Sequence, residues 1–563
     1  MGNDFAWRKM SQFCGHLGNI VFRVSSRYTA DPMPNQQQLL EMLMQKNAAT
    51  EYGKKYGFEN ITTFEQYQDC VPLTSYEDYE PYIDRMLNGE QGLITYKKIK
   101  RYVQTSGSAG KPKLIPLCGK AIWNFQIMGF CAPMGSSLNY YKQRGEELPA
   151  QRSFLLIEVV NKDLPNGNKS SCLSALPFNL LRPFSSFFSV TPKEIFYPEK
   201  PDETDMNYFK LRFALENEGV TALTAALVTY IESMFEYLEK NWQILVDDIE
   251  KGTIDSSVRC PEQLRKKLLR KCRPNPERAA WLRREFEKGF DTPIAPRIWP
   301  ELAWTSAMRS GSLALFAEKL KKYCGDLPFN NTGYVASESL MAMPLEMSAT
   351  DGVLLPKSCL FEFLPVGAPE GTRPLLLDQL EVGKDYEVII TNLAGLYRYR
   401  MYDVVRVTGY YQKTPKVEFL YRSNLVLNIT GEKTTQKMLD WAVDKACAEV
   451  GMQYDRFCFE GVLQDGQAPY YKILFEAPEA DAEVRAKIGP VLDKYLRESN
   501  LYIDVRRRED VLACPQVQFL IPGTFDAYTQ SLREKGVNIN QVKPVTILNT
   551  QERKDFFLAR VAD

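Results

Sequence analysis

Nine residues, Thr105 to Lys113, gather the kinds of group that bind phosphate. Their sequence, TSGSAGKPK, holds three hydroxyl side chains, two glycines and two lysines. Glycines let backbone amides point at an anion, hydroxyls donate hydrogen bonds, and lysines bring positive charge. The spacing is not that of a Walker A loop, because only two residues separate Gly107 from Gly110 and a proline follows Lys111. Such residues are also common in surface turns, so the stretch alone predicts either a triphosphate-binding loop or an ordinary turn.

The segments on either side of this loop predict regular structure. Lys98 to Gln104 reads as a strand, and Lys113 to Leu117 returns to apolar residues. A helix-like run then opens near Lys120. The loop is therefore expected after a strand and before an apolar segment that leads into a helix.

Length and composition restrict the class of protein. A chain of 563 residues is too long for one core and predicts two or more domains. Lys and Arg together number 70, as do Asp and Glu, so the formal charge is zero. This balance argues against a broad surface for nucleic acid or for an anionic membrane. We therefore expect no nucleic-acid partner and no membrane partner. Separately from the charge balance, small-molecule partners and a monomer are expected.

The cysteines and the single histidine exclude several chemistries. The twelve cysteines form no CxxC pair and the chain has one histidine, His16, so a Cys/His zinc site is not expected. Any Ser-His-Asp or Cys-His mechanism would have to use His16, in a segment that looks like a docking helix, so we expect a structural or surface histidine. Scattered thiols, no signal peptide and no apolar run of roughly 20 residues predict a cytoplasmic enzyme. Its reaction must then rely on electrostatics, positioning, carboxylates and lysines.

Hydrophobic periodicity predicts the order of the elements. Residues 1–90 read as mostly helical, and the middle of the chain alternates strand-like runs with helices, which indicates an α/β core. Phe361 to Pro365 and Tyr386 to Asn392 read as strands that lead into a turn near Ala394 and Gly395. A domain boundary is predicted near Tyr421 to Asn424, after which strands and helices alternate to the end.

The loop at Thr105 resembles the phosphate loop of the adenylate-forming superfamily, whose pattern is Thr/Ser-Ser-Gly-Thr/Ser-Thr/Ser-Gly-x-Pro-Lys, with only Ala109 departing from it. Further segments narrow the resemblance to one branch, the Gretchen Hagen 3 acyl acid–amido synthetases. They follow the family's order along nearly the whole chain: 47–58 (NAATEYGKKYGF), 71–89 (VPLTSYEDYEPYIDRMLNG), 296–300 (PRIWP), 310–312 (SGS), 334–338 (YVASE), 395–405 (GLYRYRMYDVV) and 522–543 (PGTFDAYTQSLREKGVNINQVK).

The resemblance implies an α/β fold in two domains. Residues 1–422 would form a large N-terminal adenylate-forming domain with mixed β-sheets flanked by helices. Residues 423–563 would form a smaller, mobile α+β lid. The implied enzyme uses ATP and Mg²⁺ to convert a carboxylic acid into an acyl-adenylate, and then transfers the acyl group to an amine, expected to be that of an amino acid. Because two anions must approach each other, such a site has to supply positive charge.

The resemblance also implies roles for individual residues around the nucleotide. The loop would hold the β- and γ-phosphates through Thr105, Ser106, Gly107, Ser108, Gly110 and Lys111. Glu338 would help to hold Mg²⁺, which takes few protein ligands, while Tyr334 and neighbours such as Ser337 would line the adenine pocket. Asp403 would accept hydrogen bonds from both ribose hydroxyls. Two positions depart from the family: Val335 where a smaller residue is usual, and Tyr402 where glycine is expected.

Two lysines are implied on or beyond the domain boundary. Lys433 matches a family lysine near the nucleotide, and Lys543 resembles the lid lysine that approaches the α-phosphate during adenylation. A lysine on a moving lid supplies charge for one step and then withdraws. Arg398 and Arg400 are predicted to share one face of a strand, either in the site or as a solvated strand face. Met341, Met343 and Met347 are predicted either to line the acyl pocket, with residues from Leu211 to Ser312, or to be core.

Two alternatives stay open at this point. An acyl- or aryl-CoA ligase would share the first half-reaction and then use a thiol, although the C-terminal motif favours the amido synthetases. A nucleotide-binding homologue without activity is the second alternative, which the departures at Val335 and Tyr402 keep in play.

Overall fold

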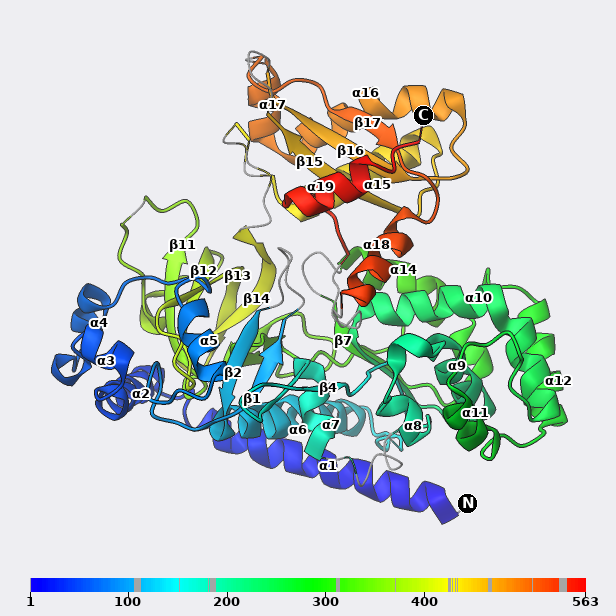
Figure 1. The fold of residues 1–563 in the computed structure, drawn as a ribbon, viewed down its shortest axis with the longest axis horizontal. Coiled ribbons are helices and arrows are strands. Elements are labelled where there is room, and N and C mark those ends of the chain that lie inside the picture. Colours follow the sequence, from blue (N-terminus) through cyan, green and yellow to red (C-terminus); the bar gives the residue numbers. More distant parts are fainter. Residues whose placement is uncertain are drawn as a thin grey trace. The chain divides into compact units, whose positions relative to one another are not determined.

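The computed structural model describes residues 2–105, 113–150, 152–180, 182, 189–309, 314–369, 371–423, 427, 429–430, 432, 434–463, 468–508, 510–535 and 544–562 (Figure 1). It divides into two compact units. The first contains most of the chain up to Phe419, and the second contains Leu420–Asp563 together with the short segment Tyr402–Val404. No helix in the described part of the chain is both long enough and apolar enough to cross a membrane.

The first 90 residues fold mainly into helices. These are α1 (Gly2–Ser26), α2 (Pro32–Asn47), α3 (Glu51–Lys55), α4 (Phe64–Cys70) and α5 (Glu80–Leu87). Helix α4 begins after Thr63, because Thr63 and Gln66 form a capping box that satisfies amides of the first turn. Apolar side chains from α2 to α5 pack into the core of the first unit, so these helices are part of that unit.

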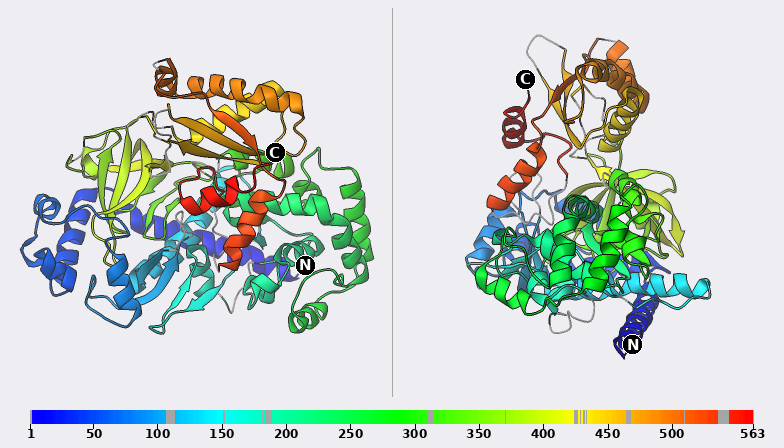
Figure 2. Two further views of the ribbon diagram at one scale, coloured as in Figure 1. Left: turned by 45° about the horizontal axis from the view of Figure 1, so that its top comes forward. Right: turned by 90° about the vertical axis from the view of Figure 1, so that its right-hand side faces the viewer.

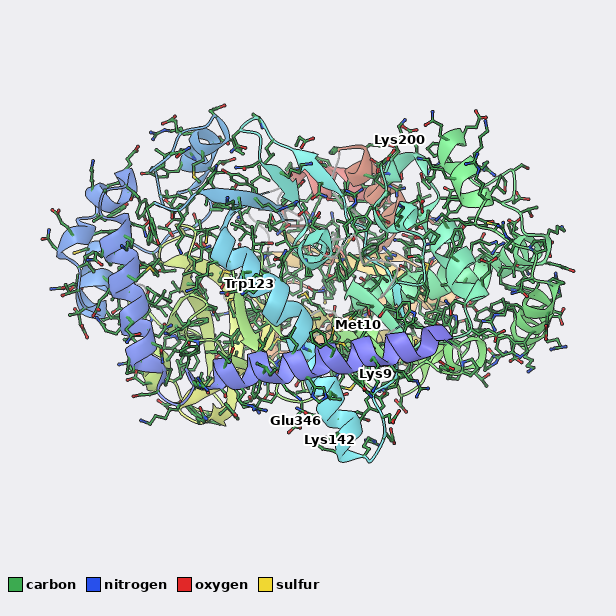
Figure 3. The ribbon with its side chains drawn as sticks, turned by 90° about the horizontal axis from the view of Figure 1, so that it is seen from below. Lys9, Met10, Trp123, Lys142, Lys200 and Glu346 are labelled. Carbon is green, nitrogen blue, oxygen red and sulfur yellow. The ribbon has the colours of Figure 1, made fainter. Side chains whose placement is uncertain are left out.

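Helix α1 crosses α6 (Gly119–Gln143) at glycines (Figure 3). A Cβ atom at Gly15 would lie 2.9 Å from Cβ of Leu138, and one at Gly135 would lie 2.9 Å from the amide nitrogen of Asn19. Only glycine permits so close an approach of the two backbones. His16 is exposed on α1, which confirms the expectation of a structural or surface histidine.

The predicted elements around the loop at Thr105 are present. Strand β1 (Ile99–Gln104) pairs antiparallel with β2 (Leu114–Cys118), which leads directly into α6. The same sheet, in the order β2-β1-β5-β4, is completed by β5 (Lys169–Ser171), parallel to β1, and by β4 (Asn161–Asp163). The loop therefore joins the two strands of a hairpin.

A second sheet of the first unit is parallel. It consists of β3 (Ser153–Leu155), β6 (Ala222–Leu227) and β7 (Trp304–Met308), in that order. Helices α9 (Met206–Glu216), α10 (Val228–Lys251), α12 (Pro276–Glu287) and α14 (Ala314–Cys324) pack with it around a core that includes the fully buried Trp299. Parallel strands alternating with helices confirm the predicted α/β class.

The third sheet of the first unit is a seven-stranded sheet in the order β11-β12-β13-β14-β10-β9-β8. Its strands are β8 (Tyr334–Val335), β9 (Leu340–Met343), β10 (Gly352–Leu354), β11 (Leu360–Pro365), β12 (Asp385–Thr391), β13 (Tyr399–Tyr411) and β14 (Thr414–Arg422). The predicted strands at 361–365 and 386–392 agree with β11 and β12 to within a residue. The turn predicted near Ala394 contains Gly395 at φ +107°, a conformation that favours glycine.

The second unit is a three-stranded sheet with helices on both faces (Figure 2). Successive side chains along a strand point to opposite faces of the sheet. Phe457 and Phe459 therefore belong to the hydrophobic core on one face, and Cys458 belongs to the core on the other. The sheet is β15 (Arg456–Val462), β16 (Tyr470–Glu476) and β17 (Gln516–Phe519). The helices are α15 (Gln436–Val450) and α16 (Ala482–Ser499) on one face, α18 (Thr524–Glu534) and α19 (Gln551–Leu558) on the other, and α17 (Leu501–Arg508).

Candidate active site

The loop that the sequence predicts to bind phosphate has anchored ends. Thr105, half-buried, follows β1 directly, and the register pairs Gln104 with Leu114 across the base of the hairpin. The amide nitrogen of Leu114 also donates to the hydroxyl of Tyr76 at 2.9 Å. Tyr76 belongs to the segment VPLTSYEDYEP, so this segment supports the base of the loop, a role that the sequence did not predict. The predicted residues Ser106, Gly107, Ser108, Gly110 and Lys111 lie outside the described residues.

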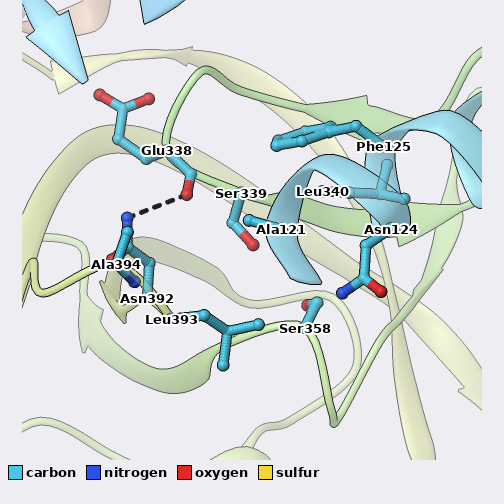
Figure 4. Close-up of a pocket in the computed structure, with 10 residues that line it drawn as sticks. All are labelled: Ala121, Asn124, Phe125, Glu338, Ser339, Leu340, Ser358, Asn392, Leu393 and Ala394. Atoms are coloured by element: carbon cyan, nitrogen blue, oxygen red, sulfur yellow. Dashed lines mark hydrogen bonds between the residues drawn. The ribbon is translucent and has the colours of Figure 1, made fainter. Parts of the chain in front are cut away.

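Glu338 lies between β8 and β9 and is buried, with 7% of its surface exposed. Its backbone carbonyl accepts a hydrogen bond from the side-chain amide of Asn392 at 3.1 Å, which fixes the turn to the end of β12 (Figure 4). A pocket beside Glu338 has room for about one water molecule, too little for a substrate. In Figure 4 the Glu338 carboxylate points away from the other residues that line this pocket. The carboxylate is thus held by a rigid turn.

The segment that carries the predicted adenine contacts is a tight hairpin. Gly333 has φ +89°, and a Cβ atom there would lie 2.3 Å from the carbonyl oxygen of Ala342, so glycine is required. The ring of Tyr334 lies 6.0 Å from the ring of Phe419, and Ser337 is half-buried. Val335 pairs with Leu340 beside a register irregularity, so the larger residue is accommodated in the strand.

Asp403 is buried on β13 and forms an ion pair with Arg422 on β14. The distance from Arg422 Nε to Asp403 Oδ1 is 2.7 Å, and 31% of the arginine side chain is exposed against 7% of the aspartate. Arg422 was not predicted from the sequence. The signal was available, because a two-residue turn at Gln412 and Lys413 sets Tyr411 against Thr414 and therefore Asp403 against Arg422.

Tyr402 has φ +56°, in the left-handed region that favours glycine. The family resemblance predicts glycine at this position, and the structure shows why. The backbone next to Asp403 adopts the conformation that glycine adopts freely, although the residue is tyrosine. Tyrosine at position 402 therefore raises the conformational free energy of the turn but leaves its backbone geometry unchanged.

The prediction for the two arginines is wrong in one respect. Arg398 precedes β13 at φ +45° and is 4% exposed, so it is not on a strand face shared with Arg400. Its guanidinium pairs with the buried Glu362 at 3.0 Å and donates to the carbonyls of Gln68 and Val71. Arg400 pairs with Glu387 at 2.8 Å. Both arginines have carboxylate partners, and Arg398 ties α4 to the seven-stranded sheet.

The methionines are core. Met341 and Met343 lie in the main core of the first unit, and Met347 lies in a separate cluster with Met134 and Trp304. Their exposed fractions are at most 7%. Of the two possibilities left open by the sequence, the structure supports packing.

Lys433 and Lys543 lie outside the described residues, but the neighbours of Lys433 are held by a buried polar network. Glu432, which is fully buried, accepts hydrogen bonds from the amide nitrogens of Ile429 and Thr430 and from the hydroxyl of Tyr471. The Thr434 hydroxyl lies 2.9 Å from the Tyr471 hydroxyl, to which it can donate, and accepts from the side-chain amide of Asn500 at 3.0 Å. Burial acts to raise the pKa of Glu432, but these hydrogen bonds outweigh it and hold that pKa below its usual value.

The donor set suits a hard cation held by few protein groups. In the described part of the chain, no three His, Cys, Asp or Glu side chains gather where they could hold a metal ion. Mg²⁺ needs no such cluster, because it keeps several waters and commonly takes one or two carboxylates plus substrate phosphates. The Glu338 carboxylate, on its fixed turn, fits that requirement.

Three family models match the chain in order. The GH3 family N-terminal domain matches residues 23–329, the GH3 family central domain matches residues 352–422, and the GH3 family C-terminal domain matches residues 437–552.

Curated relatives and a solved structure match along most of their length. An indole-3-acetic acid-amido synthetase, GH3.8 of Oryza sativa subsp. indica, is 28% identical over 90% of this chain and 87% of its own. A jasmonoyl–L-amino acid synthetase, JAR6 of Nicotiana attenuata, is 28% identical over 92% and 91%. The structure of the GH3.15 acyl acid amido synthetase superposes with a TM-score of 0.82, at 24% identity and covering 96% of both chains, which confirms the fold.

Proposed function

The chain belongs to the GH3 family, and on that premise we propose how it works as an acyl acid–amido synthetase, a ligase that forms carbon–nitrogen bonds. The observation that carries this function is the ordered match of all three GH3 domains over residues 23–552. This ordered match decides against the alternative that the chain is an acyl- or aryl-CoA ligase.

The reaction has two balanced steps. First, a carboxylate oxygen of the acid attacks the α-phosphorus of ATP, which gives the acyl-adenylate and pyrophosphate. Then the uncharged amine of an amino acid attacks the acyl carbon, which forms the amide bond, releases AMP and loses one proton. The first step brings two anions together, so the protein has to supply preorganised positive charge and hydrogen-bond donors.

The described residues support this chemistry at three places. The hairpin residues Gln104 and Leu114 pair at the base of the loop that we assign to the β- and γ-phosphates. Ser106, Gly107, Ser108, Gly110 and Lys111 are its proposed donors. The hairpin at Tyr334 and Ser337 is assigned to the adenine. Asp403, a buried carboxylate with acceptor oxygens, is assigned to the ribose hydroxyls.

We assign Glu338 to Mg²⁺, which would neutralise phosphate charge when bound. Glu338→Ala should therefore lower the rate of pyrophosphate exchange, and excess Mg²⁺ should restore part of it. Glu262→Ala is a suitable control, since Glu262 is exposed and pairs with Lys266 at 2.6 Å. Full exchange by Glu338→Ala at low Mg²⁺ would exclude the assignment.

The relatives indicate only the chemical class of the two substrates. The similar proteins are named for indole-3-acetic acid and for jasmonoyl amino acid products. We propose that this chain likewise joins a small apolar carboxylic acid to an amino acid, in the cytoplasm and as a monomer. The mass in solution, measured by light scattering, tests the monomer.

One experiment tests the function directly. The full-length protein is incubated with ATP, Mg²⁺, a panel of acids and either mixed amino acids or CoA, and the products are identified by mass spectrometry. Amide products with amino acids, together with acid-dependent ATP–pyrophosphate exchange, are expected. Thioesters alone, or no exchange with any acid, would contradict the proposal.

A further inference from the structure

Arg309 is a half-buried arginine at the carboxyl end of a parallel sheet. It follows β7 directly, and β7 lies parallel to β6 and β6 to β3. In open α/β sheets, ligands bind outside the carboxyl ends of the parallel strands. Arg309 therefore stands where the fold class places substrates.

The guanidinium of Arg309 has few partners for its degree of burial. Among the described residues it donates one hydrogen bond, to the carbonyl oxygen of Ser348 at 3.1 Å, and lies 4.1 Å from the ring centre of Phe329. No carboxylate among the described residues forms an ion pair with it. The charge of Glu318 attracts Arg309 without forming a direct ion pair. The Glu318 side chain is exposed and forms an ion pair with Lys321.

Other arginines whose pKa is lowered by burial have more hydrogen-bond acceptors than Arg309. Burial lowers the pKa of Arg101, Arg278 and Arg309. Arg101 donates to Asn161 and Ser171, and Arg278 donates to the carbonyls of Leu215 and Ile298. In the described part of the chain Arg309 has one such acceptor, although a guanidinium carries five N–H donors.

The partners of Arg309 are themselves held in place. Ser348 has φ +69°, a conformation that is costly for a residue other than glycine. It is kept there because its amide donates to the Phe329 carbonyl at 2.7 Å and its hydroxyl accepts from the Phe329 amide at 3.1 Å. The aromatic ring and the carbonyl thus fix the plane of the guanidinium and leave donors for a ligand.

Resting on the proposed function, we propose that Arg309 is a specificity-determining residue that binds a carboxylate which is not consumed in the reaction. Guanidinium binds carboxylate through paired, charge-assisted hydrogen bonds. Such a carboxylate has two possible sources: a second acidic group on the acyl substrate, or the α-carboxylate of the amino acid. In both cases Arg309 would select substrates by charge.

Two pairs of substrates separate the two sources. In the acid arm, pyrophosphate exchange is measured with hexanoate and with adipate, which differ by a second carboxylate. In the amine arm, synthetic acyl-AMP is offered to L-alanine and to L-alaninamide, which lacks the α-carboxylate. In one of the two pairs, wild type should favour the member with the additional carboxylate, adipate or L-alanine. In Arg309→Gln that preference should disappear through a rise in KM, by about 10–100-fold, as expected for a lost charge-assisted hydrogen bond.

Arg485→Gln is the matched control. Arg485 also donates to one backbone carbonyl, that of Ala480 at 3.0 Å, and lies 4.4 Å from the ring of Phe519, but it belongs to α16 and follows no parallel strand. It should leave both preferences unchanged. An unchanged preference in Arg309→Gln, or an equal loss for both members of each pair, would overturn the inference, while turnover of the members that lack the additional carboxylate, hexanoate and L-alaninamide, still demonstrates the proposed function.

A direct binding measurement keeps the inference testable if no acid is turned over. Calorimetric titration of adipate and of L-alanine into the full-length wild type and Arg309→Gln measures the contact without catalysis. Loss of binding in the variant supports the inference. Equal binding by both proteins overturns it.

Discussion

Tyr402 shows how one residue can depart from its family without a change of backbone. At φ +56° it keeps the conformation of the glycine that the family resemblance predicts. A left-handed conformation costs a residue with a side chain about 1–2 kcal/mol, part of which glycine gives back through its greater freedom when unfolded. The turn that precedes Asp403 is therefore expected to be strained.

Replacing Tyr402 tests that strain. Tyr402→Ala removes the side chain but keeps the steric cost, whereas Tyr402→Gly removes both. Tyr402→Gly should therefore be more stable than Tyr402→Ala by about 1 kcal/mol, measured by urea unfolding. An alanine variant at least as stable as the glycine variant would show that the turn is unstrained.

Asp403 combines a structural ion pair with its proposed contact to ribose, and substitution can separate the two. Asp403→Ala should weaken ATP binding by about 10–100-fold, the usual effect of a hydrogen bond to a charged group. Arg422→Met removes the ion pair but keeps the carboxylate, so it should weaken ATP binding less. Calorimetric titration of ATP measures both. Unchanged affinity in a folded Asp403→Ala protein would remove Asp403 from the site.

At the scale of elements, the segment before α15 is held by buried polar groups. Tyr471 of β16 and Asn500, which lies between α16 and α17, converge on Glu432 and Thr434. A buried carboxylate is tolerated here because four donors satisfy it. This network fixes the start of the second unit's core.

The pKa of Glu432 sets the pH dependence of that network. Because the folded-state pKa is lowered, the stabilisation is complete above the unfolded pKa of about 4.3 and is lost as pH falls through the folded value. Glu432→Gln should therefore be less stable than wild type at neutral pH, by about 1–3 kcal/mol, and the difference should shrink at acid pH.

Thermal unfolding from pH 7 down to about pH 3 measures this difference. Glu449→Gln is the control, because Glu449 is an exposed carboxylate of α15 whose pKa is also lowered, first by its hydrogen bond to Lys494. Its effect should be much smaller. If the difference in thermal stability between wild type and Glu432→Gln stays constant with pH, the charge of the carboxylate does not stabilise the fold.

At the scale of the whole molecule, the division into two compact units suits a reaction with two steps. The proposal is that the second unit is a mobile lid, beginning near residue 423, and that it carries Lys543 to the α-phosphate for the first step only. The residue itself lies outside the described part of the chain, so the assignment rests on the motif NINQVK.

Timing the two steps separately tests Lys543. Lys543→Ala should lower pyrophosphate exchange by roughly 10²–10³, the usual loss for one electrostatic donor. Transfer from synthetic acyl-AMP to the amine should fall far less, because the lysine has moved away by then. Lys433→Ala serves as the comparison. Equal loss in both steps would indicate that Lys543 supports the lid in both poses, and no loss in either would point to Lys433.

The sequence by itself determined the family, the α/β class and the elements around the phosphate loop. These features depend on residues close together in the chain: hydrophobic period for β1, β2, β11 and β12, loop residues between Thr105 and Lys113, and motifs in a fixed order. Local patterns of this kind can be recognised without knowing which distant segments contact each other in the fold.

Only the tertiary structure decided which side chains face each other. The Tyr76 hydroxyl accepts from the amide of Leu114, and the Tyr471 hydroxyl donates to Glu432, across 38 and 39 residues of chain. Each pairing depends on strand register or on packing between distant elements, and a shift of one residue would turn the side chain to the other face. The same reason explains why Arg398 was misplaced: its carboxylate partner, Glu362, comes from a different strand.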